Sequence, residues 1–403
     1  MGTLKEINPK MIPECNIGTL GHVSHGKTSL VASLTGKITL THSEELKRGI
    51  TIRLGYADAT IYRCVKCIRY STSNKCPYCF SDAEITRTIS FVDAPGHETL
   101  MATVLTGASL MDGVLFVIAA NEKCPQLQTR EHLAVLEIAG IKNAIIIQNK
   151  IDLVSEEQAL KNYNEIKEFI KGTLLENAPI IPVSAQYRTN IDVVLEAMEE
   201  FIPTPKHDES KEPKMLAARS FDINKPGTKP EKLVGGILGG AIVHGKFSVG
   251  EKIEIRPGVK IGNRYQPLFT KITGLQKAGI NLDVAGAGGL LGMMTTLDPS
   301  LTKSDSLVGN IAGLPGKLPE SKETISMNVK FMNRIEGMPS VKADETILIN
   351  VGTARSVGVV TNYKKETMEM KLKIPVCVEE KEKVAISRQI DGRWRLVGYG
   401  VIV

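Results

Sequence analysis

The stretch GHVSHGKT, residues 21–28, constrains the fold of this chain more than any other feature. It matches the pattern G-x-x-x-x-G-K-[ST] and follows an apolar run, residues 16–20, that is typical of a strand. A glycine-rich turn between a strand and a helix lets backbone amides and the helix N-terminus surround phosphate groups. The sequence therefore predicts a phosphate-binding loop at the carboxyl end of a strand.

This loop contains most of the candidate nucleotide-binding residues. Lys27 is expected to reach the β- and γ-phosphate oxygens, and the Thr28 hydroxyl is expected to bind magnesium. The loop candidates are Gly21, Val23, Ser24, His25, Gly26, Lys27, Thr28 and Ser29. The alternative, a glycine-rich turn without a ligand, is disfavoured by the motifs that follow it in the chain.

Two further stretches are typical of residues around a γ-phosphate. VDAPGHE places Asp93 and Gly96 after a second predicted strand, where the carboxylate can hold the magnesium shell and the glycine amide can sense the phosphate. The polar stretch HSEELKRGITIRLGYAD contains Thr51, whose hydroxyl could reach magnesium only when a γ-phosphate is present. An ordinary exposed loop is the alternative for that stretch.

Two motifs indicate which base is bound. In NKID, the Asp152 carboxylate can accept two hydrogen bonds from guanine N1 and N2, a pair of donors that adenine lacks. In VSAQ, the Ala185 amide is the expected donor to guanine O6. The candidate residues are Asn149, Lys150, Asp152, Ser184, Ala185 and Gln186. Motifs in this order favour GTP and GDP as ligands.

The pattern of apolar runs changes along the chain and divides it into domains. Strand-like runs at 16–20, 89–92, 114–119, 144–148 and 180–183 alternate with helical patterns such as 128–139 and 156–171. A Pro- and charge-rich stretch at 202–214 precedes short, glycine-punctuated β-type runs, and a second break lies at 313–323. We predict an α/β P-loop GTPase domain over residues 1–205 and two small all-β barrel domains over 206–320 and 321–403.

Four cysteines are grouped inside the first domain. Cys64-x2-Cys67 and Cys76-x2-Cys79 are two pairs that can place four thiolates tetrahedrally around zinc. The insertion that holds them, at about 62–82, has little apolar content, so a structural metal is expected to hold its shape. Redox-active cysteine pairs are the alternative.

Charge differs between the two halves of the chain. Residues 1–205 carry 20 basic and 23 acidic side chains, whereas 206–403 carry 30 and 21. The basic excess of the second half fits a nucleic-acid partner, although a solvated surface explains it equally well. No apolar run approaches the roughly 20 residues that span a bilayer, so we expect a cytoplasmic protein without a membrane partner.

The motifs RGITI, DAPGHE and NKID together resemble those of translational GTPases of the elongation factor Tu class. SEELKRGITIRLGYAD, RSFDINKPGT and VAISRQIDGRWRLVGYG, with the cysteine cluster, resemble the gamma-subunit family of archaeal and eukaryotic translation initiation factor 2. The resemblance covers nearly the whole chain. It implies a GTPase that carries initiator methionyl-tRNA to the small ribosomal subunit, in a heterotrimer with alpha and beta subunits, and hydrolyses GTP on start-site selection.

The resemblance also implies roles for single residues. His97 falls where the class has a histidine that orients the attacking water, and a role mainly in switching is the alternative. Asp93 and Gly96 accompany it in the catalytic motif. Archaeal relatives commonly have Asp at the position of Ser24, where with the Gly49 backbone it resembles a second magnesium site. Serine carries no charge, which leaves the second magnesium open.

Contacts to tRNA are expected on three segments. Glycines in the first barrel would let the RNA backbone approach, an aromatic ring after the switch loop could stack on the aminoacyl end, and arginines surround the single tryptophan near the C-terminus. The candidates are Tyr56, Gly235, Gly236, Arg388, Arg393 and Arg395. A hairpin bend, a core tyrosine and a barrel-closing strand are the respective alternatives.

Other functions share this architecture. An elongation-type carrier, including the selenocysteine-specific kind, and the GTPase partner of sulfate adenylyltransferase are alternatives, as is a GTP-binding scaffold. A change of tRNA affinity between the GDP and GTP states would separate the carriers from the last two.

Overall fold

The computed structural model describes residues 8–39, 45, 51–332 and 341–403. The chain divides into two compact units, which are described separately. The first consists of Met1–Val104 with Met111–Lys206, and the second of Leu105–Leu110 with His207–Val403. In the described ranges, no helix is both long enough and apolar enough to cross a membrane.

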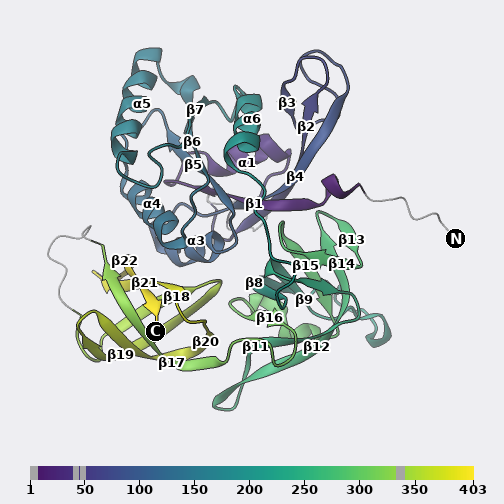
Figure 1. Cartoon of the computed structure of the whole chain (residues 1–403), viewed down its shortest axis with the longest axis vertical. Coiled ribbons are helices and arrows are strands. Elements are labelled where there is room, and N and C mark those ends of the chain that lie inside the picture. The colour runs from purple at the N-terminus through teal and green to yellow at the C-terminus, as the bar shows by residue number, and fades with distance from the viewer. Residues whose placement is uncertain (1–7, 40–44, 46–50, 333–340) are drawn as a thin grey trace. The chain divides into compact units, whose positions relative to one another are not determined.

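The first unit is built on a seven-stranded sheet with the order β3-β2-β4-β1-β5-β6-β7 (Figure 1). Its strands are β1 (Pro13–Leu20), β2 (Gly55–Cys64), β3 (Tyr70–Ser71), β4 (Ala83–Asp93), β5 (Gly113–Ala119), β6 (Ala144–Asn149) and β7 (Ile180–Val183). Strands β4, β1, β5, β6 and β7 are parallel, whereas β2 pairs antiparallel with β4 and β3. The carboxyl ends of the parallel strands therefore meet at one edge, where ligands bind in such sheets.

Helices cover both faces of this sheet. They are α1 (Lys27–Thr35), α4 (Leu127–Ala139), α5 (Glu156–Ile170) and α6 (Ile191–Phe201), whereas α3 (Met101–Ala108) is divided between the two units. Figure 1 shows α1 and α6 on one side of the strands and α4 and α5 on the other. Leu30 of α1 and Met198 of α6 pack with Phe91 and Ile147 in one buried core. Because helices cover both faces of the sheet, its parallel strands are nearly continuous apolar runs.

The four cysteines lie where β2 and β4 extend beyond the rest of the sheet. Strand β2 alternates buried and partly exposed residues and pairs with β4 from Gly55 to Cys64. The short β3 pairs with β2 through Tyr62 and Ser71, and the cysteines occupy the turns on either side of it. We refer to residues 64–82 as the knuckle. Neither β2 nor β3 was expected from the sequence, because polar residues interrupt both.

The second unit contains two barrels. In the first, β11-β16-β8-β9-β15-β12 form a ring closed by β11 and β12, with β13 beside β12 and a separate β10–β14 pair. Its strands are β8 (Lys214–Phe221), β9 (Ile237–His244), β10 (Lys246–Ser248), β11 (Lys252–Ile261), β12 (Arg264–Lys277), β13 (Ile280–Leu282), β14 (Val284–Gly286), β15 (Leu291–Thr295) and β16 (Ile311–Gly313). Barrel closure removes the exposed sheet edges that β domains must otherwise protect.

The second barrel has six antiparallel strands in the closed order β17-β20-β19-β18-β21-β22. Its strands are β17 (Ser321–Phe331), β18 (Thr346–Val351), β19 (Ala354–Lys364), β20 (Thr367–Cys377), β21 (Lys383–Ile390) and β22 (Arg393–Ile402). Alternate residues such as Ile325, Met327 and Val329 point into the core. The predicted fold class, an α/β P-loop domain followed by two small all-β barrels, is thereby confirmed.

Candidate nucleotide-binding site

The loop between β1 and α1 is shaped by two glycines that no other residue could replace. Gly21 has φ +140°, and a Cβ there would lie 2.1 Å from the Val117 carbonyl oxygen. Gly26 has φ +92°, and its Cβ would lie 2.3 Å from Asn149 Nδ2. Both features exclude a side chain. The loop therefore lies directly against the carboxyl ends of β5 and β6.

Lys27, the first residue of α1, reaches back over this loop. Its Nζ donates to the carbonyl oxygens of Gly21 and His22, each at 2.8 Å. Burial lowers the pKa of Lys27 to about 8, and the nearby Asp93 carboxylate opposes that shift. A buried ammonium held by carbonyl dipoles is a strong attraction for phosphate oxygens, because little water competes for it.

Hydroxyl groups converge on the fully buried Asp93 at the end of β4. Thr19 donates to Oδ1 at 2.9 Å, while Thr28 and Thr39 donate to Oδ2 at 2.7 and 2.6 Å. The Thr28 and Thr51 hydroxyls are 2.8 Å apart. A carboxylate surrounded by hydroxyl oxygens is the hard donor set that Mg²⁺ prefers. The structure thus brings together the predicted magnesium residues except Gly49, which lies outside the described residues.

Gly96 and His97 follow Asp93 and face the same space. A Cβ on Gly96 would lie 2.3 Å from Lys27 Nζ and 2.8 Å from the Val23 amide nitrogen, so only glycine allows this approach. The half-buried His97 ring has Nδ1 2.9 Å from the Thr99 hydroxyl. That contact orients the ring from its Nδ1 side.

A cavity of about 270 Å³ joins these groups. Its lining residues are Val23, Ser24, Gly26, Lys27, Thr28, Ser29, Thr51, Gly96, His97 and Lys150. The lining unites the phosphate loop, the switch threonine, the DAPGH motif and NKID, which are far apart in the sequence. Ser24 has φ +61°, so the loop is tightly curved at this position.

Asn149 connects the phosphate loop with the second base motif. Its Nδ2 donates to the His25 carbonyl at 2.9 Å, and its Oδ1 accepts from the Ala185 amide at 3.1 Å. The Ala185 amide, expected to meet guanine O6, is thus directed towards Asn149. The Ser184 hydroxyl accepts from the Tyr187 amide at 3.2 Å and closes the turn.

The remaining base-motif residues differ in exposure. Asp152 lies in a short 3-10 turn, Ile151–Leu153, and is exposed, as is Gln186. Lys150 has φ +65° and lines the cavity. The carboxylate of Asp152 is therefore accessible to a base.

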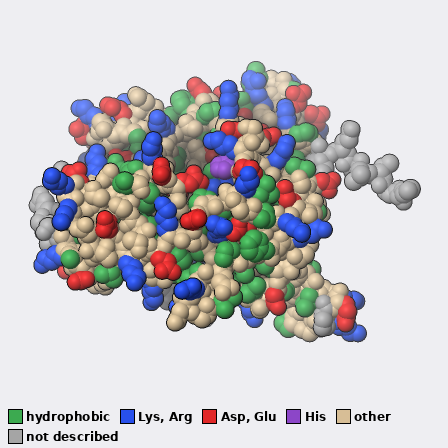
Figure 2. Space-filling model, turned by 60° about the horizontal axis from the view of Figure 1, so that its bottom comes forward, with side chains coloured by type: hydrophobic (Ala, Val, Ile, Leu, Met, Phe, Trp, Pro, Cys, Tyr) green, Lys and Arg blue, Asp and Glu red, His purple; other side chains and the backbone are tan. Residues whose placement is uncertain are grey.

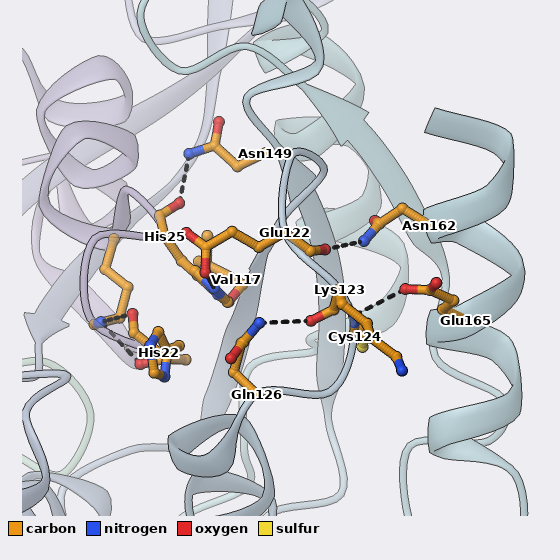
Figure 3. A network of polar contacts seen from close by, with 12 residues as sticks. His22, His25, Val117, Glu122, Lys123, Cys124, Gln126, Asn149, Asn162 and Glu165 are labelled. Carbon is orange, nitrogen blue, oxygen red and sulfur yellow. Dashed lines mark hydrogen bonds and ion pairs between the residues drawn. The ribbon is translucent and has the colours of Figure 1, made fainter. Parts of the chain in front are cut away.

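Two buried histidines, His25 and His132, contact the loop or the strand beside it, and Figure 3 shows His25. His132 of α4 is completely buried, and its Nδ1 accepts from the Gly21 amide at 2.9 Å. His25 Nδ1 lies 3.1 Å from the Val117 carbonyl, and burial lowers the pKa of His25 to about 3. His25 is therefore neutral near pH 7, so its 3.5 Å approach to Glu122 is no ion pair there. His132 could not be predicted from the sequence, because only the fold brings α4 to Gly21.

The four knuckle cysteines form a second candidate site. Their sulfur atoms lie within 4.8 Å of one another, with Cys64 and Cys79 at 3.4 Å and Cys67 and Cys76 at 3.4 Å. The amides of Lys66 and Cys67 lie 3.4 Å from Cys64 Sγ and stabilise it as a thiolate. Four converging sulfurs suit a tetrahedral structural metal.

The structure gives the candidate tRNA residues roles within their own domains. A Cβ on Gly235 would lie 1.9 Å from the Thr295 carbonyl oxygen, and one on Gly236 would lie 2.4 Å from Thr302. Close packing inside the first barrel is therefore a sufficient reason for both glycines. Tyr56 lies half-buried on β2 opposite Val92.

Arg388 corrects part of the C-terminal prediction. It is 5 % exposed, and its guanidinium donates to both carboxylate oxygens of Glu345, to Oε2 at 3.0 Å. This pairing joins β21 to the residue that precedes its neighbour β18. Because the guanidinium is buried and paired, it is not accessible to RNA. Arg393 is exposed and Arg395 half-buried on β22. On the face shown in Figure 2, basic and acidic side chains are interspersed.

Comparisons with known proteins identify the domains. Residues 13–204 match the model of the elongation factor Tu GTP binding domain, and residues 323–402 match that of initiation factor eIF2 gamma, C terminal. With the site described above, the fold defines a translational GTPase of the elongation factor Tu class.

Full-length relatives narrow this class. Translation initiation factor 2 subunit gamma of Pyrococcus horikoshii is 58 % identical, with 96 % of this chain and 97 % of that protein covered. The protein of the same name from Methanocaldococcus jannaschii is 55 % identical over the same shares. The chain belongs to the family of translation initiation factor 2 gamma subunits.

Solved structures agree on the fold. A bacterial selenocysteine-specific elongation factor superimposes with a TM-score of 0.75 at 23 % identity, covering 97 % of this chain and 58 % of that one. Elongation factor SelB from Methanococcus maripaludis superimposes with a TM-score of 0.73 at 22 % sequence identity. The superposition covers 97 % of this chain and 79 % of that one. At this identity the likeness concerns the architecture alone.

Proposed function

We propose that this chain is a GTP-switched carrier that delivers initiator methionyl-tRNA to the small ribosomal subunit. The observation that carries the proposal is the convergence of Lys27, Thr51 and Lys150 around one cavity in a chain of the gamma-subunit family. Such a site can distinguish GTP from GDP, because Thr51 and Gly96 line it together with the phosphate loop.

The phosphate half of the site would work through positioning and charge. Lys27 would exchange its bonds to the Gly21 and His22 carbonyls for β- and γ-phosphate oxygens, supported by the amides of the loop. Magnesium, when bound, would neutralise charge between the β- and γ-phosphates. Thr28 and Thr51 would hold it directly, with Asp93 behind Thr28.

Base selection would depend on the NKID motif and the turn after β7. The exposed Asp152 carboxylate would accept from guanine N1 and N2, and the turn from Ser184 to Gln186 would approach guanine O6. Asn149 would keep this turn in register with the phosphate loop.

Hydrolysis would use His97 to orient water at the γ-phosphate, with Gly96 sensing that phosphate. Phosphoryl transfer needs positioning more than covalent chemistry, which suits a ring oriented by Thr99. We propose one magnesium at this site, to which the uncharged Ser24 side chain contributes no ligand charge. Zinc bound by the four knuckle cysteines would have a structural role.

The partners follow from the family. We propose assembly with alpha and beta subunits in a cytoplasmic heterotrimer, and a division into a GTP-binding domain at 1–205 and barrels at 206–320 and 321–403. Tyr56, Arg393 and Arg395 stay candidates for tRNA contact. The partly exposed Gly235 and the buried Gly236 stay candidates only as part of the first barrel.

A gel shift tests this proposal against its relatives. The chain with its alpha subunit is mixed with charged initiator tRNA, and separately with charged elongator methionyl-tRNA, in a non-hydrolysable GTP analogue or GDP. The proposal predicts a complex with initiator tRNA that forms preferentially with the analogue. Equal binding of both tRNAs would favour an elongation-type carrier, and no binding of either would favour a metabolic GTPase subunit or a scaffold.

A further inference from the structure

The knuckle is attached to the helix that follows the base-reading turn. Arg69 Nη1 lies 3.9 Å from Asp192 Oδ2, and burial together with the nearby Asp192 carboxylate raises the pKa of Tyr78. The Arg69 guanidinium also stacks over the Tyr78 ring at 4.6 Å. Two side chains from different cysteine turns therefore stack on each other beside one carboxylate of α6.

The metal-binding turns determine where those two side chains lie. Arg69 comes two residues after Cys67, and Tyr78 lies between Cys76 and Cys79. Tyr70, the next residue after Arg69, packs against the core that contains α6. The approach of the cysteine sulfurs thus determines the geometry of the contact with α6.

Asp192 lies only a few residues beyond the base-reading turn, residues 184–190. The Thr189 amide donates to the Ser184 carbonyl at 3.0 Å, and Asn190 Nδ2 donates to the Pro182 carbonyl at 2.8 Å. Asn190 is the N-cap residue of α6, and Asp192 belongs to the first turn of that helix. A turn closed by these bonds leaves little freedom between the start of α6 and the Ala185 amide.

We propose that Arg69, Tyr78 and Asp192 are positioning residues through which the four-cysteine knuckle fixes the guanine-reading turn. The inference rests on the proposed guanine site and deepens it, since it assigns part of the base affinity to contacts outside the cavity. It also gives the structural metal a consequence for the nucleotide. A metal bound by the four cysteines would fix the two cysteine turns. The Arg69 side chain then contacts Asp192, which lies in the first turn of α6.

Other side chains of the knuckle take no part and provide controls. Phe80 is 80 % exposed, and Lys75 pairs with Asp82 within the knuckle itself. Replacing Lys75 changes the charge of the knuckle without affecting its contact with α6. Lys75→Ala is therefore the matched control for Arg69→Ala.

The test compares two nucleotides that differ at the guanine edge. Dissociation constants are measured for GDP and for 2-aminopurine riboside diphosphate, which lacks O6, and bound zinc is determined for every variant. In Asp192→Ala and in Arg69→Ala/Tyr78→Ala, we expect GDP affinity to fall about fivefold, with zinc retained and the analogue unaffected. Lys75→Ala should equal the wild type, and Asp192→Asn, which keeps the side-chain size but loses the charge that faces Arg69, should weaken GDP binding as Asp192→Ala does.

The outcomes separate the inference from the proposed function. GDP affinity unchanged in all variants, or an equal loss for both nucleotides, would overturn the inference while leaving the guanine site in place. A wild-type protein that binds the analogue as tightly as GDP would overturn the guanine site itself, and the inference with it.

Discussion

Replacing Asn149 by Ala should separate the two halves of the nucleotide site. The side chain is 2 % exposed and makes two hydrogen bonds, from Nδ2 to the His25 carbonyl and from the Ala185 amide to Oδ1. Each bond contributes about 1 kcal/mol net, and a partner left buried without one costs about 1–3 kcal/mol. We therefore expect the first unit to lose about 2–4 kcal/mol of unfolding free energy.

The assay should report on the first unit alone. The single tryptophan, Trp394, lies in the last barrel, so its fluorescence follows the wrong domain. Helices α1, α4, α5 and α6 lie in the first unit, so far-UV circular dichroism during urea unfolding follows that unit. Hydrogen exchange of the Ala185 amide gives an independent local measurement.

Two further variants sharpen the experiment. Asn149→Asp keeps an acceptor for the Ala185 amide but removes the donor to His25, so its loss should be intermediate. Asn177→Ala changes an exposed asparagine of the same unit and should stay within about 0.5 kcal/mol of the wild type. If Asn149→Ala also stayed within that limit, with GDP affinity unchanged, Asn149 would not connect the two halves.

Four other substitutions test separate parts of the account. Arg87→Met removes a buried guanidinium that pairs with Glu199 at 2.7 Å and donates to two carbonyls at the end of α6, and urea unfolding should show a loss of about 3 kcal/mol. The pKa of His25 is about 3 in the fold against 6.5 ordinarily, so the unfolded chain binds the proton more tightly. Stability should therefore be complete above pH 6.5 and fall as the pH decreases towards 3, and His25→Gln should flatten that dependence in acid titrations. Cys76→Ser should reduce bound zinc in metal analysis and make the knuckle sensitive to limited proteolysis, whereas full zinc retention would contradict a four-thiolate site. Asp152→Asn should weaken GDP binding about tenfold or more while improving xanthosine diphosphate, whose C2 carbonyl can accept from the new amide; unchanged GDP affinity would exclude the assigned role.

Features with a local cause were predictable from the sequence. The predicted strand at 180–183 coincides with β7, and the predicted helix at 156–171 differs from α5 by its last residue. The phosphate loop is similarly local, since the strand, the glycines and the helix start are adjacent in the chain. The cysteine spacing also sufficed, because two short turns can converge without help from distant segments.

Features that depend on distant packing were not predictable. Thr19 and Thr39 join the Asp93 cluster only because β1 pairs with β4 and the chain after α1 lies near β4. Gly235 suggested an approach by RNA, whereas the Thr295 carbonyl occupies that space. Arg388 suggested an exposed charge beside Trp394, but a glutamate before the neighbouring strand pairs with it. In each instance, the residue that makes the contact is distant in the sequence, so only the folded chain brings the two together.

Protection of initiator methionyl-tRNA from spontaneous deacylation tests the central claim most directly. The chain is assayed with its alpha subunit, in a non-hydrolysable GTP analogue and in GDP, and Lys27→Met serves as the variant that cannot hold phosphate. The account predicts strong protection with the analogue, little with GDP, and little in either state for Lys27→Met. Equal protection in the two nucleotide states, or none in either, would contradict a GTP-switched carrier.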